Sequence, residues 1–496
     1  MIKDSDMILY RPWAELKQLQ NKKLHSFITK HLYPFSPYYR KLLDDNKIDP
    51  ASIRTVEDLR RIPFTSKQDF RDAIQKDPAK GTLAFCLQPD KDTIKKYLPK
   101  TEFLKLMLRR LIKGEAGFKT LMEKEYKPIF LTSTAGTTST PMPFLYSDYD
   151  MENLKVYGSR MIATIGIKNE RLVNMFPYAP HLAFWLAVQG GLAANVFVLS
   201  TGGGKTMGTE GNIRSILKMK PQFLLGVPSY VYHVLKTARA EKQDFSFLNR
   251  IILGASPVPN GFKLKIASLL KEMGASDVRV FGTYGFTEAR GAWAECPTEI
   301  SVSSGYHTSP DMEVFEVIDP VTGEVKGEGE DGELVYTGID ARGTCVLRYR
   351  TGDLVKGGIS YSPCPHCGKT VPRISSVLTR ASNIKNVQLS KIKGSLVNLN
   401  DLERFLDDRP EISEWQIEIR KKNDDPFEVD ELLLNVCLAQ DVDKGEFAHL
   451  LNEEVISNSE VSFNKIHYVT HQEISGLIEV ESAVKAKKIV DKRPSN

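Results

Sequence analysis

The sequence predicts a large α/β N-terminal domain, with a doubly wound sheet and a β-rich subdomain, followed by a small C-terminal α+β domain. Two observations predict this class. From about residue 170 to 285, short apolar runs alternate with helical stretches, whereas after residue 305 strands and turns follow one another. A chain of 496 residues is also too long for one ordinary domain. We expect the domains to span residues 1–379 and 380–496.

The alternating region is expected to form a parallel sheet, because its strands read as continuous apolar runs that helices cover on both faces. Helical stretches such as Glu210–Lys218 and Gly261–Met273 separate these runs. The predicted strands are Leu172–Phe176, Asn195–Ser200, Phe223–Val227, Arg250–Leu253 and Val278–Phe281.

Strands are predicted in the β-rich part at Met312–Ile318, Glu333–Thr337 and Cys345–Tyr349. The C-terminal domain is expected to contain helices near Leu399–Leu406 and Gly445–Val455 and strands near Trp415–Ile419, Leu432–Leu438 and Lys465–Val469. Residues 1–128 are mostly helical in pattern. Among them, Glu102–Lys113 forms a basic amphipathic helix, which we expect to face the core on one side rather than to bind a membrane.

Composition excludes several classes of protein. A net charge of +5 gives no support for nucleic-acid binding, and six cysteines are too few for a disulfide scaffold. The polar start of the chain is unlike a signal peptide. The apolar segment Leu182–Leu199 is interrupted by Gly190 and Gly191, so we interpret it as a buried helix and a buried strand rather than a membrane span. We therefore expect a cytoplasmic protein.

A loop rich in hydroxyl groups follows the predicted strand Ile129–Leu131. Seven of the ten residues Thr132–Pro141 are Ser or Thr, and such a loop can wrap a polyphosphate or be a surface loop without a role. The rival motif Gly202–Thr206 is not a Walker A loop, because the position that needs its first glycine is Leu199.

Three further segments complete a pattern with this loop: Tyr284–Glu288, Tyr349–Asp353 and the basic C-terminal stretch that contains Lys485. In this order and spacing the chain resembles the adenylate-forming superfamily, which includes acyl- and aryl-CoA ligases, carrier-protein adenylation domains and luciferases. Within it the chain is most similar to the phenylacetate–CoA ligase family. The segments that carry this likeness are Ser200–Gly204, Gly226–Tyr230, Gly254–Pro257, Gly332–Thr337 and Arg348–Asp353.

The resemblance implies a ligase that uses ATP, Mg²⁺ and CoA and first converts a carboxylic acid to an acyl-adenylate. It implies catalytic roles for Lys485, Glu288 and Thr287, with Glu288 holding Mg²⁺ and Thr287 near the α-phosphate. Thr134, Gly136, Thr137 and Thr138 would hold the β- and γ-phosphates. Adenine would lie at Tyr284 and Gly285, beside Gly254, Ala255 and Ser256, and the ribose at Asp353 and Arg380.

In the second half-reaction implied by the resemblance, the small domain rotates about a hinge near Arg380–Ser382 and a thiol attacks the acyl-adenylate. The chain departs from the family here. The phosphate loop has Ser139-Thr140 where the family has Gly-Lys, the hinge lacks two acidic residues, and Val484 replaces a glycine. The acceptor therefore stays open between CoA, a carrier protein and an amine. A non-catalytic, zinc-stabilised binding protein of the same fold is the third alternative.

The resemblance also implies that Tyr178, Phe184 and Tyr230 line the acid pocket, which favours an aromatic or apolar acid without fixing which one. The expected partners are this acid and CoA or a carrier protein, with no nucleic acid and no membrane span, and a homodimer is allowed.

Cysteines near position 364 suggest a metal site. Pro363–Gly368 contains a Cys-x-x-Cys turn, which supplies half of a tetrahedral zinc site. Relatives carry cysteines and a histidine at matching places, so the resemblance implies a structural Zn²⁺ site at Cys296, His307, Cys364 and Cys367. A redox role and simple burial are the alternatives. We expect Cys86, Cys345 and Cys437 to be core residues.

Overall fold

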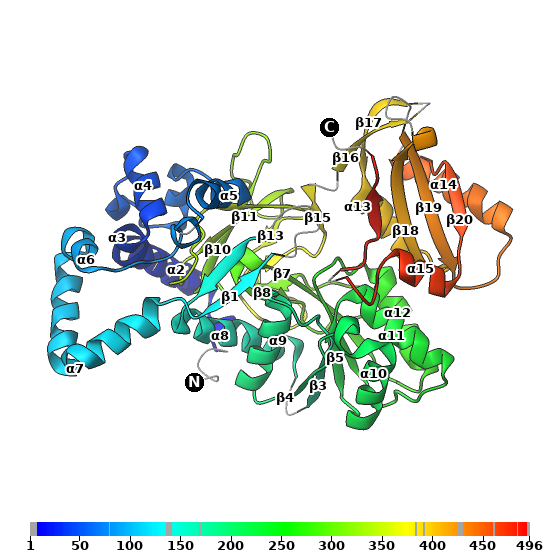
Figure 1. Cartoon of the computed structure of the whole chain (residues 1–496), viewed down its shortest axis with the longest axis horizontal. Coiled ribbons are helices and arrows are strands. Elements are labelled where there is room, and N and C mark those ends of the chain that lie inside the picture. The colour runs from blue at the N-terminus through cyan, green and yellow to red at the C-terminus, as the bar shows by residue number, and fades with distance from the viewer. Residues whose placement is uncertain are drawn as a thin grey trace.

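A parallel sheet flanked by helices forms the centre of the large domain (Figure 1). The computed structural model describes residues 7–78, 80–134, 141–167, 170–381, 384–389, 392–424, 430–459, 462–483 and 485–493. The strand order in this sheet is β4-β3-β5-β6-β7-β8. Its parallel members confirm the five predicted strands: β3 (Arg171–Asn174), β4 (Phe197–Ser200), β5 (Phe223–Gly226), β6 (Arg250–Leu253) and β7 (Arg279–Phe286). The last strand, β8 (Gly291–Ala294), is antiparallel.

Two sets of helices cover this sheet: α8 (Asp148–Ile165) with α9 (Leu182–Ala193), and α10 (Gly204–Met219), α11 (Pro228–Ala240) and α12 (Asn260–Glu272). Because the β3–β4 connection runs in the opposite direction along the sheet to the later ones, right-handed crossovers put α9 and α10–α12 on opposite faces. A Cβ on Gly158 of α8 would lie only 2.4 Å from the Cα of Gly190 in α9. These helices therefore cross at a contact that only glycine permits.

The N-terminal region is helical, as predicted, and packs against the β-rich part of the large domain. Its helices are α2 (Trp13–Phe27), α3 (Tyr33–Phe35), α4 (Pro37–Asp45), α5 (Lys67–Lys76), α6 (Lys91–Tyr97) and α7 (Lys100–Tyr126). A short hairpin of β1 (Phe130–Ser133) and β2 (Pro143–Tyr146) follows.

The expectation that the basic amphipathic helix packs its apolar side on the core is wrong. This segment is the first part of α7, whose helical geometry is interrupted at Gly114. Leu104, Leu108, Leu111 and Ile112 are 56–81% exposed, because this half of α7 projects from the body of the molecule (Figure 1). None of the helices in the described ranges is long and apolar enough to cross a membrane.

The β-rich subdomain contains the sheet β10-β11-β12-β15, formed by β10 (Glu313–Ile318), β11 (Gly332–Gly338), β12 (Tyr349–Val355) and β15 (Leu378–Arg380). The strand predicted at Cys345–Tyr349 is wrong: β12 begins at Tyr349. The backbone amides of Cys345 and Leu347 bond to the Phe85 carbonyl and the Tyr39 hydroxyl, and Arg348 has a left-handed φ of 45°. A small sheet of β13 (Ile359–Ser360), β14 (Arg373–Ile374) and β9 (Tyr306–His307) lies beside it.

The C-terminal region folds as the expected α+β unit with its own core around Trp415, Ile417 and Leu434. Its main sheet has the order β20-β19-β18-β21, with β18 (Ile412–Lys421), β19 (Asp430–Leu438), β20 (Lys465–Tyr468) and β21 (Ile489–Asp491). The helices are α13 (Leu399–Asp407), α14 (Lys444–Ser459) and α15 (His471–Leu477), and a hairpin of β16 (Ile384–Leu389) and β17 (Ile392–Asn398) leads into the unit. Sequence reasoning missed β21, which has only three residues.

The small domain contacts the large domain through α11 and α12. The ring of His471 stacks on that of His233 at a centroid distance of 5.4 Å, and the Gly261 amide donates to Asp408 at 2.9 Å. The C-terminal segment after α15 then returns toward the large domain, where the Glu481 carboxylate accepts a hydrogen bond from the Thr209 hydroxyl. These contacts hold the C-terminal segment over the sheet (Figure 1).

Candidate active site

A cavity of about 1610 Å³ lies at the C-terminal ends of the parallel strands, where the small domain meets the large one. Residues from both domains line it. Of the residues singled out from the sequence, those that line it are Thr134, Ala255, Ser256, Tyr284, Gly285, Thr287, Glu288, Asp353, Arg380 and Lys485. Segments separated by some 350 positions in the sequence therefore meet around one space, large enough for a nucleotide.

The start of the hydroxyl-rich loop is fixed at the wall of this cavity. Thr134 forms two hydrogen bonds with the backbone of Met142. Its amide donates to the Met142 carbonyl, and its hydroxyl accepts from the Met142 amide, both at 3.0 Å. Gly136, Thr137 and Thr138 lie outside the described residues. The loop thus leaves the end of β1 at the cavity, which is where the sequence predicted a phosphate site.

Gly254 does not line the cavity but shapes its wall. A Cβ at this position would lie 2.3 Å from the Thr283 hydroxyl oxygen, so glycine lets the end of β6 pack directly on β7. The next residue, Ala255, has a left-handed φ of 71°. This turn brings Ala255 and Ser256 to the cavity, beside Tyr284.

Asp353 is the centre of a buried hydrogen-bonded network. The Tyr284 hydroxyl donates to one carboxylate oxygen at 2.7 Å, and the Arg380 guanidinium lies 2.8 Å from the other. Burial raises the pKa of Asp353, although the positive charge of Arg380 opposes this shift. Gly352, at φ 72°, lies in a bulge of β12 against β11, and such a bulge redirects the following side chain.

Glu288 projects from a one-turn helix, Thr287–Ala289, that directly follows β7. The turn ends at Arg290, which has a left-handed φ of 56° and forms an ion pair of 2.7 Å with Asp150. The Tyr349 hydroxyl donates to the Glu288 carboxylate at 3.0 Å. These contacts hold the carboxylate of Glu288 at the wall of the cavity.

Lys485 comes from the small domain and enters the same cavity. The segment around it is held by the amide of Lys487, which donates to the Ile478 carbonyl at 2.8 Å, and by the pairing of β21 with β18. The side chain keeps contact with solvent inside the cavity, yet protein surrounds it. This surrounding, together with the charge of Arg380, lowers the pKa of Lys485 to about 8.

The three aromatic residues expected to line the acid pocket lie outside the cavity. Tyr178 is 64% exposed and packs on Phe184 edge to face, with centroids 5.2 Å apart. Tyr230 is buried elsewhere, where its hydroxyl accepts from Asn212. On α9 the residues that face the cavity are Leu182, Ala183, Leu186 and Ala187. Because these positions share one face of the helix, Phe184 must point away from the cavity.

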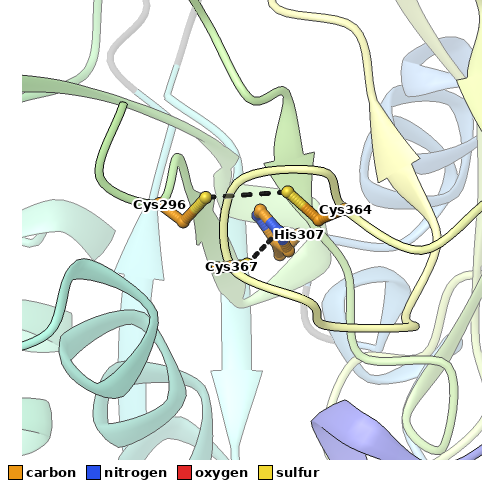
Figure 2. Close-up of side chains that lie close together, drawn as sticks. All are labelled: Cys296, His307, Cys364 and Cys367. Atoms are coloured by element: carbon orange, nitrogen blue, oxygen red, sulfur yellow. Dashed lines mark hydrogen bonds between the residues drawn. The ribbon is translucent and has the colours of Figure 1, made fainter. Parts of the chain in front are cut away.

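Three sulfur atoms and an imidazole meet at the edge of the β-rich subdomain (Figure 2). The Sγ atoms of Cys296 and Cys364 are 3.7 Å apart, and Cys367 Sγ lies 3.3 Å from His307 Nε2. All four ligand atoms lie within 4.8 Å of one another. Tetrahedral Zn–S bonds of 2.3 Å would separate two sulfur atoms by about 3.8 Å, so the donor set fits a zinc ion. His307 Nδ1 lies 3.3 Å from the Ala294 carbonyl, which fixes the ring.

Comparison with known proteins shows which family this chain belongs to. Residues 55–343, more than half of the chain, match the AMP-binding enzyme family. The chain belongs to this family.

Relatives of this AMP-binding enzyme include two bacterial proteins. Phenylacetate-coenzyme A ligase of Thermus thermophilus is 26% identical and covers 90% of this chain and 86% of its own length. Phenylacetate-coenzyme A ligase of Pseudomonas putida is 25% identical over 99% of both chains. The crystal structure of 2-hydroxyisobutyryl-CoA ligase in the postadenylation state with R3-HIB-AMP superposes with a TM-score of 0.73, at 20% identity, over 98% of this chain and 91% of that one. It shows the shared fold.

Three residues that sequence reasoning missed also line the cavity: Lys67, Arg71 and His181. Lys67 and Arg71 lie on α5, whose start is fixed by a capping box between Ser66 and Asp69. Burial lowers the pKa of Lys67, while the nearby Glu288 opposes the shift. The Ser-x-x-Asp pattern was visible in the sequence, but nothing there connected an N-terminal helix with a distant nucleotide site.

His181 stands at the start of α9. Burial and the neighbouring Lys485 lower its pKa to about 4, so the imidazole is neutral at physiological pH. Its buried Nδ1 has no hydrogen-bond partner among the described residues. The ring is therefore available to a molecule bound in the cavity.

We expect Asp353→Asn to weaken AMP binding by about tenfold to a hundredfold, because an ionised acceptor of ribose hydroxyl groups contributes roughly 1.5–3 kcal/mol and the amide would be a poorer acceptor. Isothermal titration calorimetry of the purified protein measures this. Asp441→Asn, on an exposed turn of the small domain away from the cavity, is the matched control. Equal AMP affinity in the two variants would exclude Asp353 from the ribose site.

Proposed function

We propose that this protein is an ATP-dependent carboxylic acid–CoA ligase that works through an acyl-adenylate. The observation that carries the proposal is the convergence of Thr134, Glu288, Asp353 and Lys485 on one cavity. Membership of the AMP-binding enzyme family and the similarity to phenylacetate–CoA ligases over most of the chain support it.

In the first half-reaction the carboxylate oxygen of the acid attacks the α-phosphorus of ATP. The bond from that phosphorus to the bridging oxygen of the β-phosphate breaks, and pyrophosphate leaves. Negative charge builds up on the phosphate oxygens, so fixed donors and cations aimed at them should account for most of the acceleration. We assign this role to the Lys485 ammonium and the Thr287 hydroxyl. Glu288 would hold Mg²⁺, which would neutralise part of the phosphate charge.

Lys67 and Arg71 would supply the positive charge that the phosphate loop lacks. The loop carries Ser139-Thr140 in place of the Gly-Lys of the family. The two cations on α5 line the same cavity as Thr134 and Glu288. A lysine or arginine beside departing pyrophosphate stabilises its charge whichever segment it comes from, so the missing loop lysine does not argue against adenylation.

In the second half-reaction the CoA sulfur attacks the acyl carbonyl carbon, the bond to the AMP oxygen breaks, and the thiol proton leaves to solvent. We propose that the domain of residues 380–496 rotates to withdraw Lys485 and admit the thiol. The contacts that would have to separate include the Gly261–Asp408 hydrogen bond and the His233–His471 stack. They also include apolar packing of Ile474, Ile478 and Val480 on the core of the large domain. A carrier protein or an amine remains the alternative acceptor, because the hinge residues differ from the family pattern.

We also propose that Cys296, His307, Cys364 and Cys367 hold a structural Zn²⁺ ion. Four protein ligands would complete a tetrahedral shell and leave no open position for substrate, which is typical of a structural site. The fit of the sulfur and nitrogen positions supports this assignment. The adjacent Tyr306, on β9 beside His307, lines the nucleotide cavity, so a metal here would stabilise the cavity wall without taking part in the chemistry.

The proposed function is tested by acid-dependent ATP–pyrophosphate exchange over a panel of carboxylic acids. Lys485→Ala should lower exchange at least a hundredfold, because it removes a cation aimed at the reacting phosphate. The same variant should still form thioester from presynthesised acyl-adenylate and CoA. Lys492→Ala, a nearby exposed lysine paired with Glu418, should keep normal exchange. Absence of exchange with every acid would overturn the proposal, and thioester formation with a carrier protein in place of CoA would change the acceptor.

Adenylation should also depend on pH through Lys485. Its pKa is about 8, so the ammonium is present below that pH and is lost as the pH rises through it. We expect kcat/KM for ATP, which reports the free enzyme, to fall on the basic side with a midpoint near 8. Lys485→Arg should be slower but should lose this basic limb, because the guanidinium stays charged. An unchanged basic limb in Lys485→Arg would assign the titration to another group.

Purified protein should contain one zinc ion per chain by elemental analysis. Cys364→Ser should lose the metal and unfold at a lower temperature, since a ligand present at a thousand times its Kd stabilises the folded state by about 4 kcal/mol. Cys86→Ser, at a buried cysteine remote from the cluster, should keep the metal. Full stability of zinc-free wild-type protein would contradict a structural role.

A further inference from the structure

The cavity continues beyond the nucleotide residues into an apolar branch between the sheet and the helices α8 and α9. We define this apolar branch by the residues that line it: Met161, Ile162 and Ile165 of α8, Leu182, Ala183, Leu186 and Ala187 of α9, and Leu172, Phe223, Leu225 and Ile252 of the sheet. None of these described lining residues is charged. The branch is thus a different environment from the polar chamber at the strand ends.

The residues that line the apolar branch form a continuous apolar surface. On α8 and α9 its residues recur at the three- and four-residue spacing of one helix face. On the sheet Phe223 and Leu225 alternate along β5, Leu172 is the register partner of Phe223, and Ile252 is the register partner of Leu225. Two helix faces and one sheet face therefore enclose the same space.

The branch is long and closes at its inner end. Phe223 is the first residue of β5 and Ile165 the last of α8, so the branch runs from the C-terminal edge of the sheet back along the whole of β5, about 10 Å at 3.3 Å per residue. At the inner end Ile165, Leu172 and Phe223 are at most 2% exposed. Near the mouth, at the first turn of α9, Ala183 keeps more exposed surface.

We propose that the apolar branch binds the unbranched hydrocarbon chain of a medium-chain aliphatic acid, with its carboxylate at the mouth near Thr287 and Lys485. This inference rests on the proposed function and names its substrate class. A branch about 10 Å deep accommodates a chain of several methylene groups, whereas a single ring next to the carboxylate would leave its inner part unfilled. The aromatic residues once expected around the acid, Tyr178 and Phe184, lie outside the cavity.

We expect kcat/KM to depend on the length of the hydrocarbon chain of the acid. Burial of each methylene contributes about 0.8 kcal/mol, or roughly a fourfold gain in kcat/KM, until the branch is filled. The depth of the branch therefore predicts a rise from butyrate through hexanoate to octanoate and a plateau or fall beyond decanoate. Phenylacetate should fall well below octanoate.

Acid-dependent pyrophosphate exchange with butyrate, hexanoate, octanoate, decanoate, dodecanoate and phenylacetate tests the inference. Octanoate or decanoate should exceed phenylacetate at least tenfold in kcat/KM. A preference for phenylacetate, or equal rates along the aliphatic series, would overturn the aliphatic assignment while leaving the ligase proposal intact. No exchange with any acid would instead overturn the ligase proposal and this inference with it.

Substitutions on α9 and α8 test whether the hydrocarbon chain of the acid binds in the apolar branch. Ala187→Phe, one helical turn inside Ala183, should lower kcat/KM for decanoate at least tenfold and change that for butyrate less than threefold. Leu192→Phe, at an exposed position of the same helix, is the matched control and should change neither. Ile162→Ala makes the opposite change by widening the branch, and should move the optimum to longer acids. If Ala187→Phe does not fold, Ile162→Ala alone decides: an unmoved optimum would exclude the branch as the acyl site.

Discussion

The buried carboxylate of Asp353 is the interaction on which the geometry of the site depends. It joins three strands of two sheets, because Tyr284 belongs to β7, Asp353 to β12 and Arg380 to β15. Arg380 is also the last residue of β15, where the chain passes to the small domain, and Asn400 of α13 donates to its carbonyl. One ion pair and a tyrosine hydroxyl thus connect the central sheet, the β-rich sheet and the small domain that carries Lys485.

This arrangement also explains the unusual electrostatics of the cavity. Arg380 and Lys485 lie close enough for each to disfavour the charge of the other, and Asp353 and Glu403 only partly compensate. Burial raises the pKa of Glu403 to about 7, with Asp407 adding to the shift. A ligand that brings several negative charges would therefore relieve repulsion between cations, which is what a nucleotide triphosphate would do.

Much of the fold could be predicted from the sequence, because continuous apolar runs identify buried parallel strands and their ends identify where ligands bind. For that reason Tyr284 and Glu288 could be placed at one edge of the sheet, whereas the family resemblance assigned Asp353 to the same site. Side-chain direction on a helix could not be predicted as well. The family resemblance implied that Phe184 lines the acid pocket, yet the phase of α9 turns its side chain away from the cavity. Lys67 was missed because its contribution depends on tertiary packing of α5. The projecting part of α7 shows that amphipathic periodicity alone does not say what an apolar face meets.

The contact between Gly158 and Gly190 has a consequence for the diversification of this chain. The backbones of α8 and α9 touch directly there, so the spacing of the two helices at the crossing does not depend on side-chain size. None of the residues that would handle ATP lies on those two helix faces. The residues that would select the acid are therefore separate from those that would bind ATP. A few substitutions along α8 and α9 could change the range of acids while the nucleotide site stays unchanged.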